Sequence, residues 1–163
     1  MIQSVDHPTR LRPVQPSDVP AVAALIREVL AEFGLTFGIG SETDHDVMAL
    51  PDSYTGKGGH FWVVEDQRNH VLGSCGLYPL AASTVELRKM YVHPAARGRG
   101  LGQTLLDKAV DTARAEGARC IVLDTHDSMT AAVHLYLRAG FVRDDDQIRG
   151  ARCTRGYRLD LYP

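Results

Sequence analysis

The chain has 163 residues, of which 44% are hydrophobic and 23% are charged, and its formal net charge is -2. This length and balance predict one globular domain over residues 1–163, and the near-neutral charge argues against a nucleic-acid partner. Three widely spaced cysteines argue against a disulfide framework, and no apolar stretch is long enough to span a bilayer, so we expect a cytoplasmic protein without a membrane partner.

The predicted elements begin with a short strand at residues 11–14 and a helix that starts after Ser17 and stops at Gly34. Apolar residues in this helix recur at the spacing i, i+3, i+4, i+7, which places them on one helical face. Residues 34–60 show no comparable period, so we interpret them as a loop with a short helix near residues 46–50. Ordered loops of this length are often functional.

The rest of the chain is predicted to form further strands and two helices. The strands are short apolar runs bounded by turn residues, at residues 61–65, 71–80, 85–92, 120–124, around Phe141 and at 153–161. The helices show the helical apolar period and run from Leu101 to Gly117 and from Ser128 to Ala139. The order β-α-loop-β-β-β-α-β-α-β-β predicts a mixed α/β fold with one sheet and helices on its faces.

The densest chemical signal is the turn Arg97-Gly98-Arg99-Gly100-Leu101-Gly102, which leads from a strand into a helix. A helix N-terminus has unpaired N–H groups and a partial positive charge, and glycines let an anion approach the backbone. Arg97 and Arg99 add two cationic side chains. The turn therefore predicts a phosphate-binding site, with a tight turn carrying solvated arginines as the alternative.

Two common nucleotide motifs do not fit this turn. A dinucleotide fingerprint would need a glycine where Gln103 stands, and the only Gly-Lys pair, Gly56-Lys57, is followed by Gly58 rather than by the Ser or Thr of a P-loop. A nucleotide-binding module that uses the turn for another phosphate stays open as an alternative.

The run Arg97-x-x-Gly100-x-Gly102 matches the signature (Gln or Arg)-x-x-Gly-x-(Gly or Ala) of the GNAT superfamily of N-acetyltransferases, and the chain resembles that family over residues 11–161. Residues 86–94, ELRKMYVHP, resemble the family's fourth strand. Residues 135–141, LYLRAGF, resemble its late helix with a tyrosine and a closing Gly-Phe, and the opening Leu11-Arg12-Pro13 resembles its first strand.

The resemblance implies a GNAT-like mixed α/β sheet splayed between its fourth and fifth strands, with helices on both faces. The pantetheine arm of acetyl-CoA would lie in that gap, where its amides satisfy backbone groups that the parted strands leave unpaired. Acetyl-CoA is thus the implied cosubstrate, and no metal is expected. The implied cofactor-binding residues are Met90, Tyr91, Val92, Arg97, Gly98, Arg99, Gly100, Leu101 and Gly102.

The resemblance also implies an enzyme that moves the acetyl group onto an amine. Because a free alkylamine is almost wholly protonated at pH 7, a base within reach of it is needed. Glu86 is the candidate base, carried over from the position at which some family members hold a basic glutamate. His93, His126 and Asp124, near the ends of the two splayed strands, are rival bases.

Tyr136 is the candidate acid for the leaving thiolate, because the resemblance places a tyrosine there and an unperturbed phenol has a higher pKa than a thiol. A backbone N–H near Met90 is the candidate donor to the developing oxyanion. Many family members carry an asparagine that helps to hold the cofactor where this chain has Met129.

The acceptor side of the family fold is built by the first helix and the loop after it, so residues 34–59 should shape specificity. The acidic cluster Glu42, Asp44 and Asp46 is interpreted either as attracting a cationic amine or as part of a solvated loop. We expect a small-molecule amine or an amino acid as acceptor. A protein lysine or N-terminus, and a sensor that binds coenzyme A without chemistry, are the alternatives, and the sequence leaves open whether the chain forms a homodimer.

Overall fold

The computed structural model describes residues 7–162 of the chain. Its strands are β1 (Arg10–Pro13), β2 (His60–Glu65), β3 (Val71–Ala81), β4 (Thr84–Val92), β5 (Cys120–Thr125), β6 (Val142–Arg143) and β7 (Arg155–Asp160). Its helices are α1 (Val19–Glu32), α2 (Asp44–Val47), α3 (Asp52–Thr55), α4 (Leu101–Ala115) and α5 (Thr130–Arg138). Within the described residues the strands form one mixed sheet in the order β1-β2-β3-β4-β5-β7-β6.

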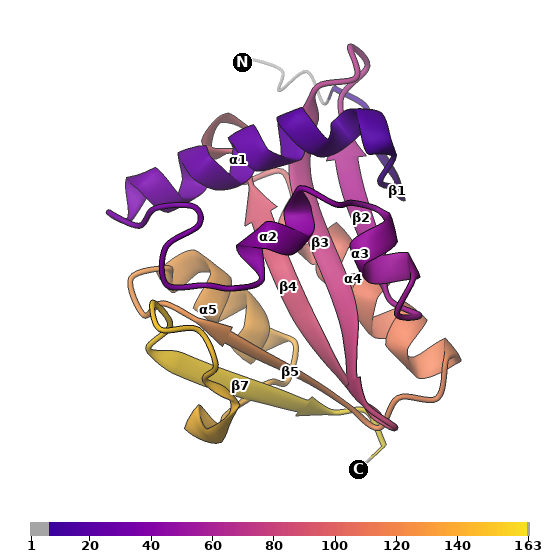
Figure 1. Ribbon diagram of the computed structural model, residues 1–163, viewed down its shortest axis with the longest axis vertical. Helices are drawn as coiled ribbons and strands as arrows, with labels where there is room; N and C mark the ends of the chain where they lie inside the picture. Colours follow the sequence, from indigo (N-terminus) through magenta and orange to yellow (C-terminus); the bar gives the residue numbers. More distant parts are fainter. Residues whose placement is uncertain (1–6, 163) are drawn as a thin grey trace, which may run out of the picture.

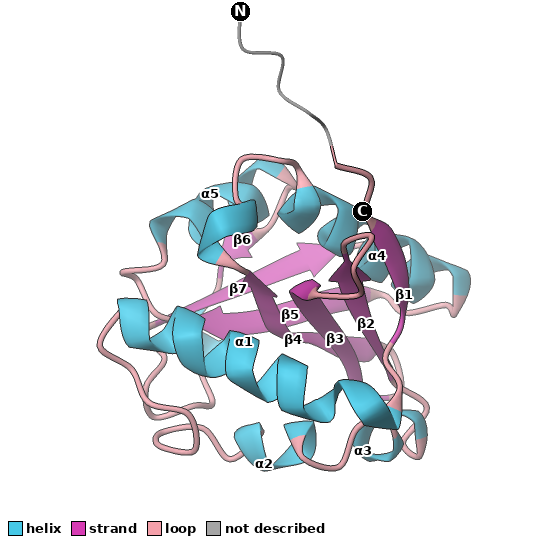
Figure 2. Cartoon of the chain, turned by 90° about the horizontal axis from the view of Figure 1, so that it is seen from above, coloured by secondary structure: helices cyan, strands magenta, loops and turns pink. Residues whose placement is uncertain are grey.

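Helices cover both faces of this sheet, as predicted. Figure 2 shows α1, α2 and α3 on one face and α4 and α5 on the other. Each face has its own apolar core. The core under α4 and α5 is centred on fully buried Leu105, Leu106 and Ile121, and the core under α1 on Val22, Ile26 and Leu30.

The predicted order of elements is confirmed, but two helix starts were wrong. α1 begins at Val19, because Pro16–Asp18 first forms a 3-10 turn in place of the cap expected at Ser17. α5 begins at Thr130, because Ser128 lies in a tight turn where its hydroxyl contacts His126 Nδ1 at 2.6 Å instead of capping the helix. The long loop after α1 holds two short helices, α2 and α3, rather than one.

The central feature of the sheet is the parting of β4 from β5. β4 pairs with β3 from Thr84 to Val92, but its parallel pairing with β5 covers only Thr84, Val85 and Glu86. β5 instead pairs along its whole length with β7. Figure 1 shows β4 and β5 diverging from a common end, so the predicted splay between the fourth and fifth strands is confirmed.

A β-bulge lies in β4 just beyond this short pairing. The register with β3 shifts so that Lys89 and Met90 stand opposite the single residue Cys75. Lys89 has φ 51°, in the left-handed region that non-glycine residues seldom occupy, and its carbonyl accepts a hydrogen bond from the buried Ser74 hydroxyl at 2.7 Å. Because a bulge bends its strand, this one directs β4 away from β5.

An ion network joins β1, β2 and the turn before α1. The Arg12 guanidinium donates to both carboxylate oxygens of Asp18, at 2.7 and 2.9 Å, and to Glu65 Oε2 at 2.8 Å. Arg10 binds the other oxygen of Glu65. The hydrogen bonds from Arg12 hold the pKa of both carboxyl groups below their usual values. The network thereby fixes the start of α1 against the sheet.

Replacing Arg12 by Met should lower the free energy of unfolding by about 3 kcal/mol at pH 7, since it leaves two buried carboxylates short of a partner. A carboxyl group whose pKa is lowered by folding stabilises the fold above its unfolded pKa of about 4, and this contribution is lost as the pH falls. Urea unfolding at pH 7 and pH 3 should therefore show a smaller difference between the two proteins at pH 3.

Arg143→Met provides the control, because Arg143 pairs with Asp145 on the exposed surface and its loss should change the stability little at either pH. An Arg12→Met deficit of equal size at both pH values would contradict this account of the network.

Candidate active site

A groove of about 560 Å³ lies where β4 ends and α4 begins, between α1 and α5. We call it the cofactor groove. Its lining includes eight of the nine predicted cofactor-binding residues: Met90, Tyr91, Val92, Arg97, Gly98, Gly100, Leu101 and Gly102. Arg99 is the exception, because its guanidinium turns away and donates to the His7 carbonyl at 2.8 Å.

The glycine-rich turn offers an open backbone surface to this groove. Gly98 has φ 77° and Gly100 has φ 74°, both in the left-handed region, and no atom lies within 4 Å of the place that a Cβ would take at either residue. Gly102 has a different reason, because a Cβ there would meet Leu135 Cδ2 of α5 at 3.2 Å, so that this side chain would have to shift. With the free N–H groups at the start of α4, this surface fits a phosphate group.

The Arg97 side chain forms an ion pair that the sequence analysis did not predict. Its guanidinium forms a bidentate pair with Glu32 at the end of α1, with both contacts at 2.8 Å, and its Nε donates to the Val92 carbonyl at 3.2 Å. This pair lowers the pKa of Glu32. Arg97 therefore ties the turn to α1, and the turn presents mainly backbone N–H groups to an anion.

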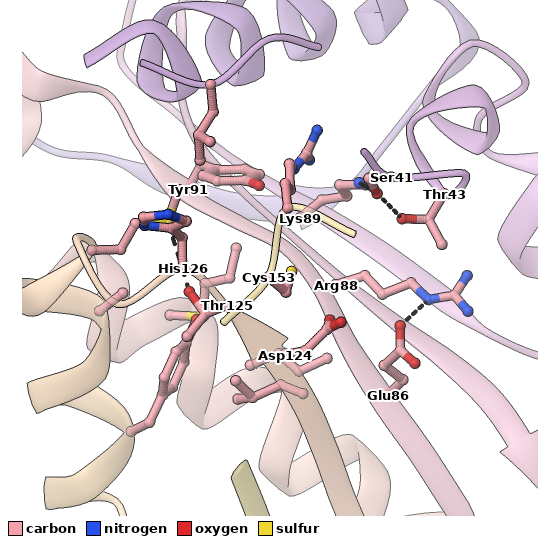
Figure 3. A pocket seen from close by; sticks show the side chains of 18 residues that line it. Ser41, Thr43, Glu86, Arg88, Lys89, Tyr91, Asp124, Thr125, His126 and Cys153 are labelled. Atoms are coloured by element: carbon pink, nitrogen blue, oxygen red, sulfur yellow. Dashed lines mark hydrogen bonds and ion pairs between the residues drawn. The ribbon is translucent and has the colours of Figure 1, made fainter. Parts of the chain in front are cut away.

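A small cavity of about 70 Å³, the inner chamber, lies in the gap between β4 and β5. Figure 3 shows Glu86 and Arg88 on one side of it, with Asp124 of β5 and Cys153 beside them. The inner chamber shares lining residues with the cofactor groove, namely Met90, Tyr91, Met129 and Ala132. The two cavities are therefore adjacent at the middle of β4.

An outer chamber of about 580 Å³ adjoins the inner chamber on its other side. Two loops that are far apart in sequence build it, residues 38–45 after α1 and residues 149–153 before β7, and the Arg152 N–H joins them by donating to the Gly40 carbonyl at 3.1 Å. It shares six lining residues with the inner chamber: Ser41, Thr43, Glu86, Arg88, Asp124 and Cys153.

The structure places Tyr136 of α5 at the wall of the inner chamber. Its ring packs in the core against Phe141 and Tyr157, with centroids 5.7 and 6.4 Å away. Burial raises the pKa of Tyr136, so the phenol keeps its proton at neutral pH. A buried, protonated hydroxyl at this wall can donate a hydrogen bond to a group in the chamber.

Glu86, the candidate base, is buried and held by two arginines. Arg88 Nε donates to Oε1 at 2.6 Å, and Arg149 Nη1 donates to Oε2 at 3.1 Å. The Arg88 guanidinium is itself fixed over the Tyr78 ring, 3.8 Å from its centre. Each carboxylate oxygen has two lone-pair directions, so each keeps one for a proton or a water. Glu86 therefore lines both chambers with an acceptor direction left free on each carboxylate oxygen.

The two rival histidines are less suited to act as a base. His93 lies outside the chambers, where Nδ1 accepts from the Ala95 N–H and Nε2 lies 3.1 Å from Glu28. His126 lines the inner chamber, but its Nδ1 accepts the Ser128 N–H at 3.1 Å. A neutral ring then carries its proton on Nε2, which makes Nε2 a donor rather than an acceptor.

Asp124 lines both chambers, but it mainly supports a loop. Its Oδ2 accepts the backbone N–H groups of Arg149 at 2.7 Å and Gly150 at 2.8 Å. These two bonds hold the loop of residues 149–153 against β5. Of the predicted candidates, the structure therefore brings Glu86, Tyr136, His126 and Asp124 to the inner chamber and leaves His93 outside.

Within the acidic cluster of the loop after α1, Asp44 is neither solvated nor free to attract an amine, whereas Glu42 is exposed at the wall of the outer chamber. Asp44 is fully buried and accepts from Lys89 Nζ at 2.5 Å, from Arg152 at 2.7 and 3.0 Å and from the Gly38 N–H at 2.6 Å. Burial by itself raises the pKa of Asp44, yet the hydrogen bonds of Arg152 and Lys89 hold it below its usual value. We call Asp44, Lys89 and Arg152 the buried ion cluster.

The sequence analysis did not predict three cationic residues that line the chambers: Lys89, Arg149 and Arg152. No local sequence pattern indicates these three residues, because each becomes part of the site only through contacts with distant segments.

Among residues 7–162 no group of three or more His, Cys, Asp or Glu side chains could hold a metal ion. In the same residues no helix has the length and apolar character needed to cross a membrane.

Comparison with known proteins identifies the family. The model of the Acetyltransferase (GNAT) family matches residues 24–141. The chain is 39% identical over 132 residues to the Escherichia coli (strain K12) protein named uncharacterized N-acetyltransferase YjgM, covering 78% of each chain. It is 29% identical over 133 residues to a Pseudomonas aeruginosa L-methionine sulfoximine/L-methionine sulfone acetyltransferase, covering 77% of this chain and 75% of that one.

A solved structure shows the same fold. The protein yncA of Salmonella typhimurium, determined with acetyl-CoA, superposes with a TM-score of 0.76 at 21% identity, covering 96% of this chain and 95% of that one. The chain belongs to the GNAT family, and it is an N-acetyltransferase of that class.

Replacing Gly100 by Val should abolish measurable binding of acetyl-CoA, because the side chain would occupy the open backbone surface of the groove. Isothermal titration calorimetry gives the dissociation constant. Gly117→Val is the matched control, since Gly117 has φ 81° and open space at its Cβ but ends α4 outside the groove. Wild-type affinity in Gly100→Val, or equal losses in both variants, would contradict the placement of the cofactor on this turn.

Proposed function

We propose that this enzyme transfers the acetyl group of acetyl-CoA directly to the primary amine of a small molecule or an amino acid. The observation that carries the proposal is the position of the inner chamber, which shares lining residues with the cofactor groove on one side and with the outer chamber on the other. A donor in the groove and an acceptor in the outer chamber would meet there without leaving the protein.

The cofactor groove fits acetyl-CoA in its shape and in its free backbone groups. The turn of residues 97–102 would hold the pyrophosphate, and the unpaired edge of β4 at Met90 and Val92 would hold the pantetheine amides. When bound, acetyl-CoA supplies the acetyl group as a thioester. Met129 lines the groove where an asparagine was expected, so its thioether can contribute packing but no hydrogen-bond donor.

The residues of the inner chamber supply the proton transfers that the reaction needs. As the amine nitrogen attacks the acetyl carbon, Glu86 accepts the proton that the amine loses, directly or through a water. The bond between the acetyl carbon and sulfur breaks, and Tyr136 gives its phenol proton to the departing thiolate. A backbone N–H near Met90, aimed at the acetyl oxygen, could contribute about 3 kcal/mol of transition-state stabilisation.

A screen for free thiol released from acetyl-CoA tests the proposal. The panel holds alkylamines, polyamines, amino acids, and peptides with a free N-terminus or a lysine. We expect release with small amines or amino acids. Release of thiol only with peptides would mean that the acceptor is a protein. No release above background with any member of the panel would mean that the protein is a sensor that binds coenzyme A.

Replacing Tyr136 by Phe should lower kcat on the order of 10²-fold, because the thiolate loses its proton donor. The affinity for acetyl-CoA should stay close to that of the wild type, since the ring and its packing remain. Tyr157→Phe is the control: Tyr157 lies in the same core but does not line the chambers, so its variant should keep its turnover. Unchanged kcat in Tyr136→Phe would remove this residue from the chemistry.

Replacing Glu86 by Gln should lower kcat/KM at pH 7 on the order of 10²-fold, because an amide cannot take the amine's proton. The deficit should shrink at high pH, where more of the amine is neutral without help. A pH profile of kcat/KM for the two proteins measures this. Glu116→Gln, at the exposed end of α4, is the control. A deficit that stays constant as the amine deprotonates would assign Glu86 a structural role instead.

A further inference from the structure

The walls of the outer chamber carry charges of both signs. Arg88 and Arg149 provide the cations, and Glu86, Asp124 and Glu42 provide the carboxylates. A chamber made for a simple alkylamine or a polyamine needs only the negative side chains. Charges of both signs suit a ligand that itself has both, with its amine and an acidic group close together.

Arg149 is the cation in this chamber that is open to a ligand. Its side chain is 48% exposed, whereas that of Arg88 is 10% exposed and is held by Glu86 and the Tyr78 ring. Within the described residues the Arg149 guanidinium has one polar partner, Glu86 Oε2 at 3.1 Å. A guanidinium has five N–H donors, so most of those of Arg149 are left for a further acceptor.

The backbone holds Arg149 at this place. Its own N–H and that of Gly150 donate to Asp124 on β5. Three residues further along, the same loop is fixed by the bonds of Arg152 to Asp44 and to the Gly40 carbonyl. A preorganised arginine loses less freedom when it binds a carboxylate, which favours a specific role for it over a solvated one.

We propose that Arg149 binds a carboxylate carried by the acceptor on the carbon next to its amine, so that the acceptor is an α-amino acid. The inference rests on the proposed function, because it requires the amine to reach Glu86. Arg149 and Glu86 are in direct contact, so a ligand that places its amine at Glu86 brings a carboxylate on the adjacent carbon within reach of the guanidinium. Guanidinium and carboxylate then pair by charge-assisted hydrogen bonds.

Matched acceptors test this without knowledge of the natural side chain. The best amino acid of the thiol-release panel is compared with its decarboxylated amine and its methyl ester, which keep the side chain and lose the negative charge. We expect kcat/KM of the wild type to be about 10- to 100-fold higher for the amino acid than for either analogue, the range of a hydrogen bond to a charged group. A ratio near one, or a preference for the amine, would overturn the inference.

The variant Arg149→Gln assigns this preference to a residue. The ratio of kcat/KM between amino acid and decarboxylated amine should fall toward one in this variant. Arg149→Lys keeps the positive charge but loses the planar, bidentate guanidinium, so its ratio should lie between those of the wild type and Arg149→Gln. Because Arg149 contacts Glu86, its replacement could also lower the activity toward every amine. Such a general loss affects both substrates equally and leaves their ratio unchanged. Arg143→Gln, an exposed arginine outside the chambers, should keep the wild-type ratio.

The outcomes separate the two proposals. Turnover of amines with no preference for the carboxylate, or a preference that survives in Arg149→Gln, would overturn the assignment of Arg149 and leave the proposed function standing. Absence of thiol release with every amine would overturn both.

Discussion

The site depends on one constraint in the sheet: β4 is paired on both sides for only three residues, Thr84 to Glu86. Beyond Glu86 its edge toward β5 has no strand partner, and buried backbone groups must find hydrogen bonds elsewhere. The bulge at Lys89 and Met90 bends the strand at this point, and the Ser74 hydroxyl satisfies the carbonyl that the bulge turns out of the ladder. The free strand edge, followed by the glycine-rich turn before α4, forms the surface on which the proposed binding of amides and phosphates depends.

Ionic contacts then close the opposite side of the gap. The buried ion cluster ties the loop after α1 to the bulge through Lys89 and to the loop before β7 through Arg152. Asp124 holds that second loop to β5 by two backbone N–H groups. Buried charges cost desolvation and are strongly destabilising when a partner is lost, so their value lies in fixing one geometry rather than in added stability. The acceptor side is thus assembled from three distant segments held together by charge.

This difference explains what the sequence could predict. The order of elements follows from apolar periodicity, the glycine-rich turn from six consecutive residues, and the candidate Tyr136 from the resemblance of residues 135–141 to the family's late helix. The ion pair of the Arg97 side chain was not predicted because its partner, Glu32, lies on another helix. The burial of Asp44 was missed for the same reason, since only Lys89 and Arg152, far along the chain, make a buried carboxylate tolerable there. The left-handed backbone of Lys89 has no signal in the residue itself.

Donor and acceptor recognition are therefore encoded in different ways. In the proposed function, the donor would be bound mainly by backbone groups of one short turn and one strand edge, whose geometry tolerates many side chains, so a family signature is enough to find it. The proposed acceptor residues are side chains such as Glu86 and Arg149, which stand 63 positions apart in the chain and contact each other only in the folded state. A change in the loop of residues 149–153 would then alter which amine fits without disturbing the turn that is proposed to hold the cofactor. The specificity of this enzyme should accordingly be sought in the pairing between its two loops rather than in the motif that reveals its family.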